Sequence, residues 1–264
     1  MRCAGYDRVD IKAANERGIK VVRVPTYSPE SVAEHAVSLG LAINRKLHLA
    51  YNRVWQGNYT LSGLVGNEVH GKTIGVVGTG SIGTCVCSIM KGFGCKVLAH
   101  DLKPNSRCID MGVEYVSLEE LLSSSHVVSL HCPLLPSTFH IINRERLALM
   151  KPNAMLINVS RGGLVDTDAL LEAVEYGKIG GCAMDVYENE GNLFDTDFSS
   201  YTSEERVRNW DRRFAMLKSY PNVLITPHSA FLTVEALNNI ANTTRDNLAA
   251  FATGQPLENE VKPM

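Results

Sequence analysis

Short apolar runs alternate with amphipathic segments over residues 72–229, and this pattern predicts the fold. Seven runs read as strands buried on both faces, because apolar residues stand at successive positions: 73–78, 96–101, 113–116, 126–133, 154–160, 181–187 and 222–228. Helical spacing appears between several of them, at 81–93, 143–149 and 166–176. Strand–helix alternation of this kind predicts an α/β domain with a doubly wound parallel sheet of the Rossmann type.

Two helical segments flank this domain in the sequence. Residues 28–55 carry a candidate N-cap at Ser28, then proline and apolar residues at helical spacing, so they predict one long helix. Residues 232–254 predict a closing helix that ends at Gly254. The polar stretch 191–220 predicts an irregular insertion, with a flap near the active face as one interpretation.

The first 27 residues predict less than a domain. Residues 1–7 are typical of a strand end, 9–18 of a helix and 19–25 of a second strand. Elements this few bury too little apolar surface to fold alone. We therefore expect them to belong to a second domain whose first part lies outside the chain.

The composition is that of an ordinary globular protein and argues against several classes of partner. The 264 residues are 45% hydrophobic and 20% charged, with a formal net charge of −2. No run of Lys and Arg occurs, so nucleic acid and anionic membrane surfaces are not expected partners. No apolar run approaches about 20 residues, and the N-terminus lacks the apolar segment of a signal peptide.

The cysteines point to a reducing environment. Seven occur without any C-x-x-C pair, which argues against a disulfide framework and against a zinc ribbon. We expect buried free thiols, no metal site and a reducing compartment, most simply the cytoplasm.

A glycine motif at residues 78–83 is the first candidate for chemistry. Gly78, Gly80 and Gly83 follow a predicted strand and open a predicted helix, as a dinucleotide cradle requires. Asp101 ends the next strand, where a carboxylate accepts hydrogen bonds from a ribose 2′-hydroxyl and repels a 2′-phosphate. The motif alone could be a structural turn, but this context predicts NAD binding and favours NAD over NADP.

Charged residues follow the last predicted strands, at the edge where open α/β sheets bind ligands. They are Arg161, Glu190 and His228. Singly, each has an ordinary structural explanation. Together, the arginine can bind a carboxylate, the histidine can exchange a proton with a hydroxyl, and the glutamate would raise the pKa of that histidine. This set suits hydride transfer between NAD and a 2-keto acid.

Six segments of the chain match family signatures in order. They are "VPTYSPESVAEHA", "GKTIGVVGTGSIG", "HCPLLPSTFHIIN", "LINVSRGGLVDTDAL", "AMDVYENE" and "TPHSAF". Over essentially its whole length, the chain resembles the NAD-dependent D-2-hydroxyacid dehydrogenases, and within them the fermentative D-lactate dehydrogenases. The resemblance implies reduction of pyruvate to D-lactate. Arg161 would bind the substrate carboxylate, His228 would be the acid/base, and Glu190 would be its partner, with Glu188 as the nearer alternative.

The resemblance also implies positions for the cofactor and the substrate. Ser81 and Ile82 would meet the pyrophosphate, and Asp101 the adenosine ribose. Cys132 and Pro133 would flank the adenosine side, and Thr138 would be a further cofactor contact. Val159 and Ser160 would line the nicotinamide side, and Asp185 would lie near the nicotinamide ribose or amide. Substrate contacts from the smaller domain would be Ala4, Gly5 and Tyr27.

The resemblance further implies how the chain is organised. Residues 1–71 would be the remnant of a flavodoxin-like substrate domain with its linking helix, 72–229 the NAD-binding domain, and 230–264 a helix that returns to the substrate domain. Residues 28–70 would support a homodimer. Open alternatives are a dehydrogenase for another D-2-hydroxy acid, an NAD-sensing corepressor, and a truncated NAD-binding form with little turnover.

Overall fold

The computed structural model describes residues 1–6, 8–194 and 196–262. The chain forms two compact units, Val32–Ala230 and a smaller one built from Met1–Ser31 and Phe231–Met264. Residues 32–71, which the sequence grouped with the smaller domain, thus lie in the larger unit. The assignment of functions to these parts remains a prediction.

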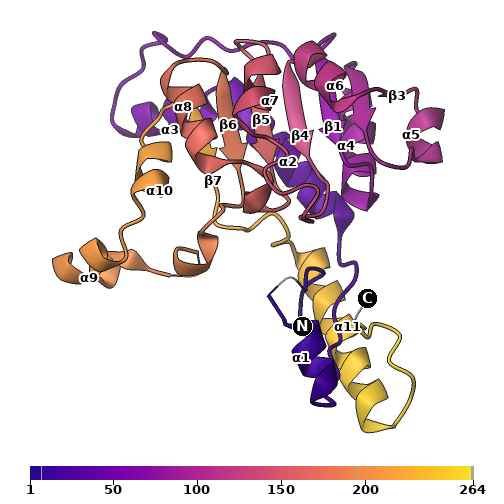
Figure 1. Cartoon of the computed structure of the whole chain (residues 1–264). Helices are drawn as coiled ribbons and strands as arrows, with labels where there is room; N and C mark the ends of the chain where they lie inside the picture. Colours follow the sequence, from indigo (N-terminus) through magenta and orange to yellow (C-terminus); the bar gives the residue numbers. More distant parts are fainter. Residues whose placement is uncertain (7, 195, 263–264) are drawn as a thin grey trace. The chain divides into compact units, whose positions relative to one another are not determined.

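The larger unit is built on a parallel sheet with the strand order β3-β2-β1-β4-β5-β6-β7 (Figure 1). Its strands are β1 Thr73–Val77, β2 Lys96–His100, β3 Glu114–Tyr115, β4 Val127–Leu130, β5 Met155–Asn158, β6 Gly181–Met184 and β7 Val223–Ile225. All seven predicted strands and the Rossmann-type order are therefore confirmed. The order reverses between β1 and β4, which is where such sheets bind ligands.

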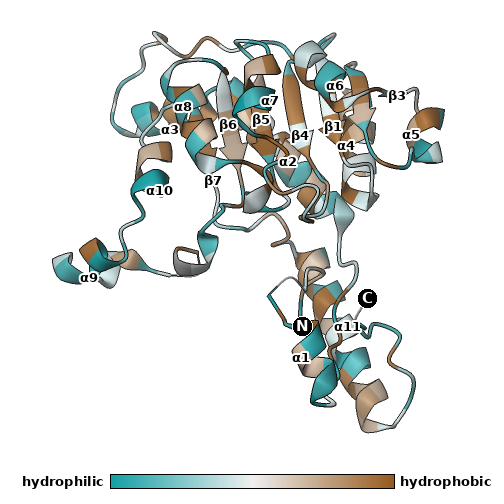
Figure 2. Ribbon diagram, viewed as in Figure 1, coloured by the Kyte–Doolittle hydropathy of each residue, from teal (hydrophilic) through white to brown (hydrophobic). Residues whose placement is uncertain are grey.

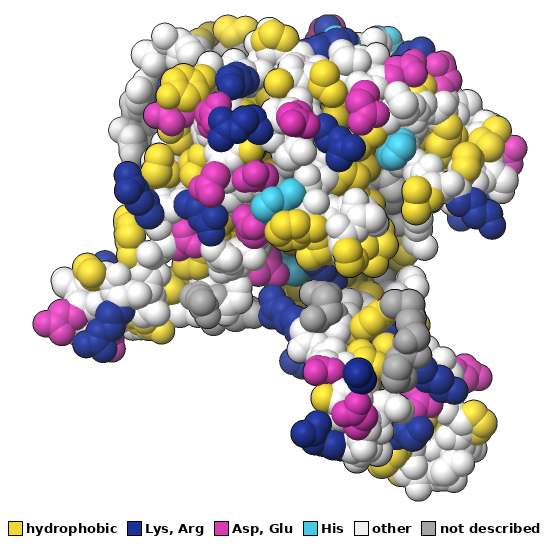
Figure 3. All heavy atoms as spheres, viewed as in Figure 1, with side chains coloured by type: hydrophobic (Ala, Val, Ile, Leu, Met, Phe, Trp, Pro, Cys, Tyr) yellow, Lys and Arg dark blue, Asp and Glu magenta, His cyan; other side chains and the backbone are white. Residues whose placement is uncertain are grey.

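The strands are apolar because helices cover the sheet. Every residue of β4 and β6 is buried, and β4 is largely brown in Figure 2. Burying this surface is the main stabilising contribution to such a fold. Side chains of both charge signs are interspersed on the face seen in Figure 3, in line with the small net charge.

The crossover helices are mostly capped by their own sequence. They are α4 Ser81–Gly92, α5 Ser106–Asp110, α6 Leu118–Ser124, α7 Arg144–Leu149 and α8 Thr167–Glu175. Asn105, Ser117, Asn143 and Asp166 precede α5 to α8, and each accepts a hydrogen bond from a backbone N–H of the first turn. Helix α4 differs, because its N-cap is Gly80, which offers no side-chain acceptor.

The single helix predicted over 28–55 is wrong. The structure has α2 Pro29–Asn44 and α3 Leu47–Trp55, separated by Lys46 in a left-handed conformation with φ of 52°. The side chain of Asn44 donates to the carbonyl of Asn67 (2.7 Å) and accepts from its N–H (3.2 Å). This tertiary contact ties the end of α2 to the following arm, so the chain turns there.

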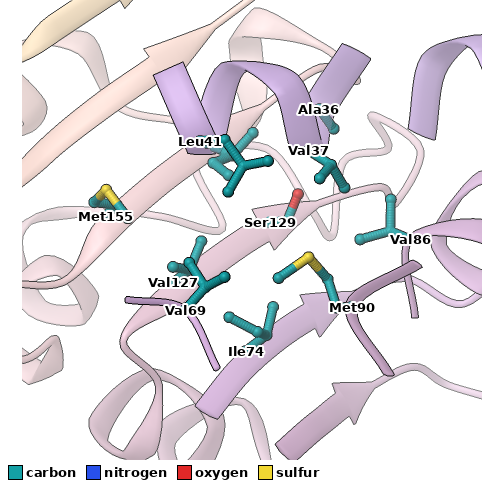
Figure 4. A pocket seen from close by; sticks show the side chains of 12 residues that line it. Ala36, Val37, Leu41, Val69, Ile74, Val86, Met90, Val127, Ser129 and Met155 are labelled. Atoms are coloured by element: carbon teal, nitrogen blue, oxygen red, sulfur yellow. The ribbon is translucent and has the colours of Figure 1, made fainter. Parts of the chain in front are cut away.

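Helix α2 covers one face of the sheet. A cavity of about 20 Å³ lies between it and the strands, lined by apolar side chains and Ser129 (Figure 4). Its lining includes Val37 and Leu41 of α2 and Ile74 and Val127 of the sheet. The space is close to that of a single water molecule, so this cavity cannot hold a dinucleotide or a keto acid.

The insertion 191–220 is more regular than its sequence suggests. It contains the short helices η2 Glu190–Asn192, η3 Phe198–Ser200, α9 Ser203–Arg208 and α10 Arg212–Leu217. Thr202 and Glu205 form a capping box on α9, none of whose residues is buried. Helices of three to six residues are too short to show a hydrophobic period, which explains why the prediction of an irregular segment was wrong.

The smaller unit consists of α1 Ile11–Glu16, α11 Val234–Ala252 and extended segments. Within the described part of this unit no strand forms, and residue 7 of the predicted strand end lies outside that part. Val22 makes only an isolated bridge with Glu260, so the strand predicted over 19–25 has no ladder. A strand needs a partner along its length, and the segment 21–24 exchanges only a few backbone hydrogen bonds with residues 3 and 259–261. Helix α11 ends before Gly254, as predicted.

Five of the seven cysteines are buried and all seven are free thiols, in line with the prediction. None of the helices in the described ranges combines the length and the apolar character that crossing a membrane requires.

Candidate active site

The glycine loop leaves room for a ligand only on one side. Gly78 has φ of 92°, and a Cβ there would lie 2.6 Å from the backbone nitrogen of Cys132. A Cβ on Gly83 would lie 2.0 Å from the carbonyl oxygen of Gly78. A Cβ on Gly80 would meet nothing within 4 Å. Because α4 begins beside this space without a side-chain cap, its first N–H groups suit a pyrophosphate, and the loop fits the cofactor.

Asp101 follows β2 beside this loop. Its Oδ2 accepts hydrogen bonds from the N–H (2.6 Å) and the hydroxyl (3.1 Å) of Thr79, and its Oδ1 accepts one from the N–H of Lys103 (3.2 Å). Burial acts to raise the pKa of Asp101, but these hydrogen bonds outweigh it and lower the pKa. The carboxylate is therefore charged at neutral pH, as discrimination against a 2′-phosphate requires. Leu102, the next residue, is 96% exposed and offers an apolar surface beside Asp101 that the sequence did not predict.

The loops after β4 and β5 meet beside the glycine loop. The hydroxyl of Ser160 donates to the carbonyl of Cys132 (2.7 Å), whose nitrogen faces Gly78. The hydroxyl of Thr138 donates to the carbonyl of Pro133 (2.6 Å) and thus closes its own turn. Val159 and Cys132 are buried. The structure places these predicted cofactor residues on the two adjoining loops beside the glycine loop. Their contacts with the cofactor remain predictions.

Arg161, Glu190 and His228 follow β5, β6 and β7, which are neighbours in the sheet. The carbonyl of Arg161 accepts from the Asn158 side chain (2.9 Å), and its guanidinium donates to the Ser160 carbonyl (2.8 Å). A Cβ on the next residue, Gly162, would lie 2.1 Å from the carbonyl carbon of Tyr187. The glycine therefore lets the loop of Arg161 lie directly on the loop that carries Glu190.

His228 and Glu190 are in direct contact. Nδ1 of His228 lies 2.9 Å from Oε1 of Glu190, whose Oε2 accepts from the N–H of Tyr187 (3.1 Å). A carboxylate at Nδ1 fixes the proton there. The His228 side chain is 38% exposed, and its Nε2 has no hydrogen-bond partner among the described residues. This nitrogen is therefore available to a substrate.

Asp185 anchors the loop that carries His228. Its Oδ1 accepts from the N–H of Ser229 (2.9 Å) and from the hydroxyl of Thr226, and its Oδ2 accepts from the N–H of Ala230 (2.8 Å). Burial acts to raise the pKa of Asp185, but hydrogen bonds from His35, Thr226 and the loop amides lower it overall. Between these anchors His228 adopts φ of 55°. The sequence did not predict this anchoring role, and the predicted nicotinamide contact stays a prediction.

Glu188, the alternative partner for His228, is engaged elsewhere. Its Oε1 lies 2.9 Å from Nε2 of His140, and its Oε2 accepts from the hydroxyl of Thr167 (2.7 Å). The pairing of Glu190 with His228, chosen from the sequence resemblance, is therefore the one in the structure.

The predicted substrate residues Ala4, Gly5 and Tyr27 lie in the smaller unit. The carbonyl of Ala4 accepts from Arg23 (3.0 Å), that of Gly5 from Cys3 (3.3 Å), and the ring of Tyr27 meets Phe231 edge-on at 6.0 Å. Their roles remain predictions.

Comparisons with known proteins agree with this geometry. Residues 37–230 match the family described as "D-isomer specific 2-hydroxyacid dehydrogenase, NAD binding domain". The chain is 47% identical to the D-lactate dehydrogenase of Escherichia coli K12 over 99% of its own length and 78% of that protein. It matches the pyruvate reductase of Chlamydomonas reinhardtii with a TM-score of 0.94 and 59% identity, over 98% of this chain and 76% of that one.

A third relative was solved with ligands bound. The D-lactate dehydrogenase of Aquifex aeolicus, in complex with NAD and lactic acid, matches with a TM-score of 0.88 and 36% identity, over 100% of this chain and 79% of that one. The chain thus spans about three quarters of each of these relatives.

Proposed function

The chain belongs to the family of NAD-dependent D-isomer-specific 2-hydroxyacid dehydrogenases, and we propose that it reduces pyruvate to D-lactate. The observation that carries this proposal is the His228–Glu190 pair, with Nδ1 held at 2.9 Å and Nε2 left open. Its position next to the loop of Arg161 supports a carboxylate-bearing substrate. Relatives named D-lactate dehydrogenase and pyruvate reductase support pyruvate within that class.

The residues of the chain divide the work as follows. NADH, when bound by the glycine loop and Asp101, supplies the hydride that reaches the carbonyl carbon. Arg161 binds the substrate carboxylate bidentately and orients the keto group. His228 donates the proton on Nε2 to the carbonyl oxygen as the alcohol forms, and it recovers a proton from water. Glu190 stabilises the imidazolium through Nδ1. The balance is pyruvate, NADH and a proton in, and D-lactate and NAD⁺ out.

The test follows NADH oxidation at 340 nm with pyruvate in the wild type and in His228→Ala, with enzymatic identification of the lactate enantiomer. We expect D-lactate from the wild type and a loss of about 10²- to 10⁴-fold in the variant. Phenylpyruvate, hydroxypyruvate and 2-ketoisocaproate are compared at equal concentration, and a clear preference for one of them would replace pyruvate as the substrate. NADH binding without turnover of any keto acid would contradict the proposed activity.

We further propose a homodimer formed through α3 and the arm that follows it, residues 56–70. Large apolar side chains stand out to solvent along this stretch: Leu47, Tyr51, Val54, Trp55, Tyr59, Leu61 and Val65. Such a patch is typical of a protein interface, and twofold dimers are the commonest assembly. Sedimentation velocity should give a dimer for the wild type and a monomer for Trp55→Glu, and a monomeric wild type at micromolar concentration would contradict the proposal.

A further inference from the structure

A chain of hydrogen bonds runs from β3 through Thr79 to Asp101. The backbone N–H of Asn105 donates to the hydroxyl of Tyr115 (2.9 Å). That hydroxyl donates to Oγ1 of Thr79 (2.8 Å), and the Thr79 hydroxyl donates to Oδ2 of Asp101 (3.1 Å). We call this chain the Tyr115 relay. It joins residues up to 36 positions apart.

The direction of the Tyr115 relay is fixed by its first donor. A backbone N–H can only donate, so it occupies a lone pair of the Tyr115 oxygen and leaves the phenolic hydrogen for Thr79. Thr79 is 2% exposed, and its carbonyl accepts from the side chains of Asn105 (2.9 Å) and Thr84 (3.1 Å). Having accepted from Tyr115, the Thr79 hydroxyl sends its own hydrogen to Asp101.

The two hydrogen bonds from Thr79 fix the orientation of the Asp101 carboxylate. Its Oδ2 receives both the N–H and the hydroxyl of Thr79, whereas Oδ1 takes the weaker bond from Lys103 at 3.2 Å. We propose that Tyr115 is a positioning residue for the cofactor: acting through Thr79, it holds the Asp101 carboxylate so that Oδ1 meets the ribose hydroxyls of NAD and excludes a 2′-phosphate. This rests on the ribose-binding role proposed for Asp101, but not on the identity of the keto acid.

The test measures cofactor affinity without turnover. NADH and NADPH are titrated into wild type and Tyr115→Phe, and the fluorescence of the bound nicotinamide gives each Kd. Loss of one hydrogen bond in the relay should weaken NADH binding about 3- to 10-fold and lower the ratio of the NADPH Kd to the NADH Kd by a similar factor. The net charge is unchanged, so a change in this ratio reports the orientation of Asp101.

Two further variants separate positioning from general stability. Tyr176→Phe makes the same chemical change at the residue that follows α8, which is 70% exposed, and should leave both Kd values unchanged. Thr79→Val removes the middle of the relay, so adding Tyr115→Phe to it should change the Kd no further. Melting temperatures are recorded for every variant.

The outcomes are decisive in both directions. An NADH Kd and a cofactor ratio within twofold of the wild type in Tyr115→Phe would overturn the proposal, even with a lower melting temperature. An equal loss from Tyr115→Phe in the wild-type and Thr79→Val backgrounds would also overturn it. If the variants change the Kd values as expected but the wild type does not reduce pyruvate, the proposal for Tyr115 stands and only the proposed activity is contradicted. A wild type that binds no NADH would contradict both.

Discussion

Two histidine–carboxylate pairs lie in the larger unit and are held at the same distance, yet they differ in the ring nitrogen that they use and in the surroundings of the other one. His228 pairs with Glu190 and His140 with Glu188, each at 2.9 Å. His140 is the more enclosed of the two, with its side chain 28% exposed: Thr167 occupies the second oxygen of Glu188, Asp166 lies 3.9 Å from the other ring nitrogen, and Phe139 stacks on the ring at 3.9 Å. His228 leaves Nε2 open.

The difference shows that a histidine–carboxylate contact does not by itself mark an acid/base. What distinguishes the two pairs is the second ring nitrogen and the way the loop is held. The His228 loop is fixed from behind by Asp185, so its ring stays in place while one nitrogen remains accessible. The His140 pair instead links the loops after β4, β5 and β6, and a second carboxylate, that of Asp166, faces its other ring nitrogen.

The largest difference between the two pairs is expected when each histidine ring is removed in turn. We expect His228→Gln to lower kcat/KM for pyruvate by about 10²- to 10⁴-fold, because the proton donor is lost. His140→Gln should change it less than about fivefold, because that ring only holds loops together. Steady-state NADH oxidation measures both, and equal losses in the two variants would contradict the distinction.

Replacing the two glutamates should also affect kcat/KM unequally, but with a smaller difference than replacing the two histidines. Glu190→Gln removes a charge-assisted hydrogen bond of about 1.5–3 kcal/mol, so kcat/KM should fall about 10- to 100-fold. Glu188→Gln should leave kcat/KM within about threefold and appear instead as a lower free energy of unfolding. A larger kinetic loss from Glu188→Gln would show that the sequence alternative was the functional one.

Asp185 and Asp166, which lie next to the two pairs, should differ in how their replacement changes the free energy of unfolding and its dependence on pH. At pH 7, Asp185→Asn should lower the free energy of unfolding by about 1.5–3 kcal/mol, since the loop amides lose a charged acceptor. The folded protein lowers the pKa of Asp185, so its stabilisation is complete above the unfolded value of about 3.9 and is lost as pH falls through the folded value. Denaturant unfolding at pH 7 and pH 3 should show the wild type and the variant converging in acid.

Asp166→Asn is the matched control. Asp166 caps α8 by accepting from Asp168 and Ala169, and asparagine caps helices equally well. The free energy of unfolding should therefore change by less than about 0.5 kcal/mol at either pH. A pH-dependent loss as large as that of Asp185→Asn would contradict the role given to the His228 loop.

The smallest effect is expected from Thr167→Val. Its hydroxyl is the second partner of Glu188, and losing one such bond should lower the free energy of unfolding by about 1 kcal/mol. Turnover should stay within twofold of the wild type, which differential scanning fluorimetry and the NADH assay check together.

The sequence was informative where the signal is local. Apolar runs predicted every strand of the sheet, and the spacing of Gly78, Gly80 and Gly83 predicted the cradle, because each depends on neighbouring residues. The break at Lys46 was missed because it depends on a contact between Asn44 and Asn67. The missing strands of the smaller unit also depend on neighbours along the strand, which the periodicity of one segment does not report.

In the candidate site, too, local features could be predicted and contacts between distant segments could not. Residue types after the strands indicated Arg161, Glu190 and His228, and the resemblance supported Glu190 over Glu188 as the partner of His228. The anchoring by Asp185 and the Tyr115 relay were not predicted, because they join loops and strands far apart in the chain.

The most direct test of the proposed proton-transferring pair is a double-mutant cycle of His228 and Glu190 in pyruvate-dependent NADH oxidation, with NADH binding measured in each variant. Because Glu190 is proposed to act only through His228, His228→Gln/Glu190→Gln should have the same kcat/KM as His228→Gln alone, with NADH affinity unchanged. Losses that multiply in the double variant, or a His228→Gln enzyme that keeps more than about a tenth of its activity, would contradict the pair.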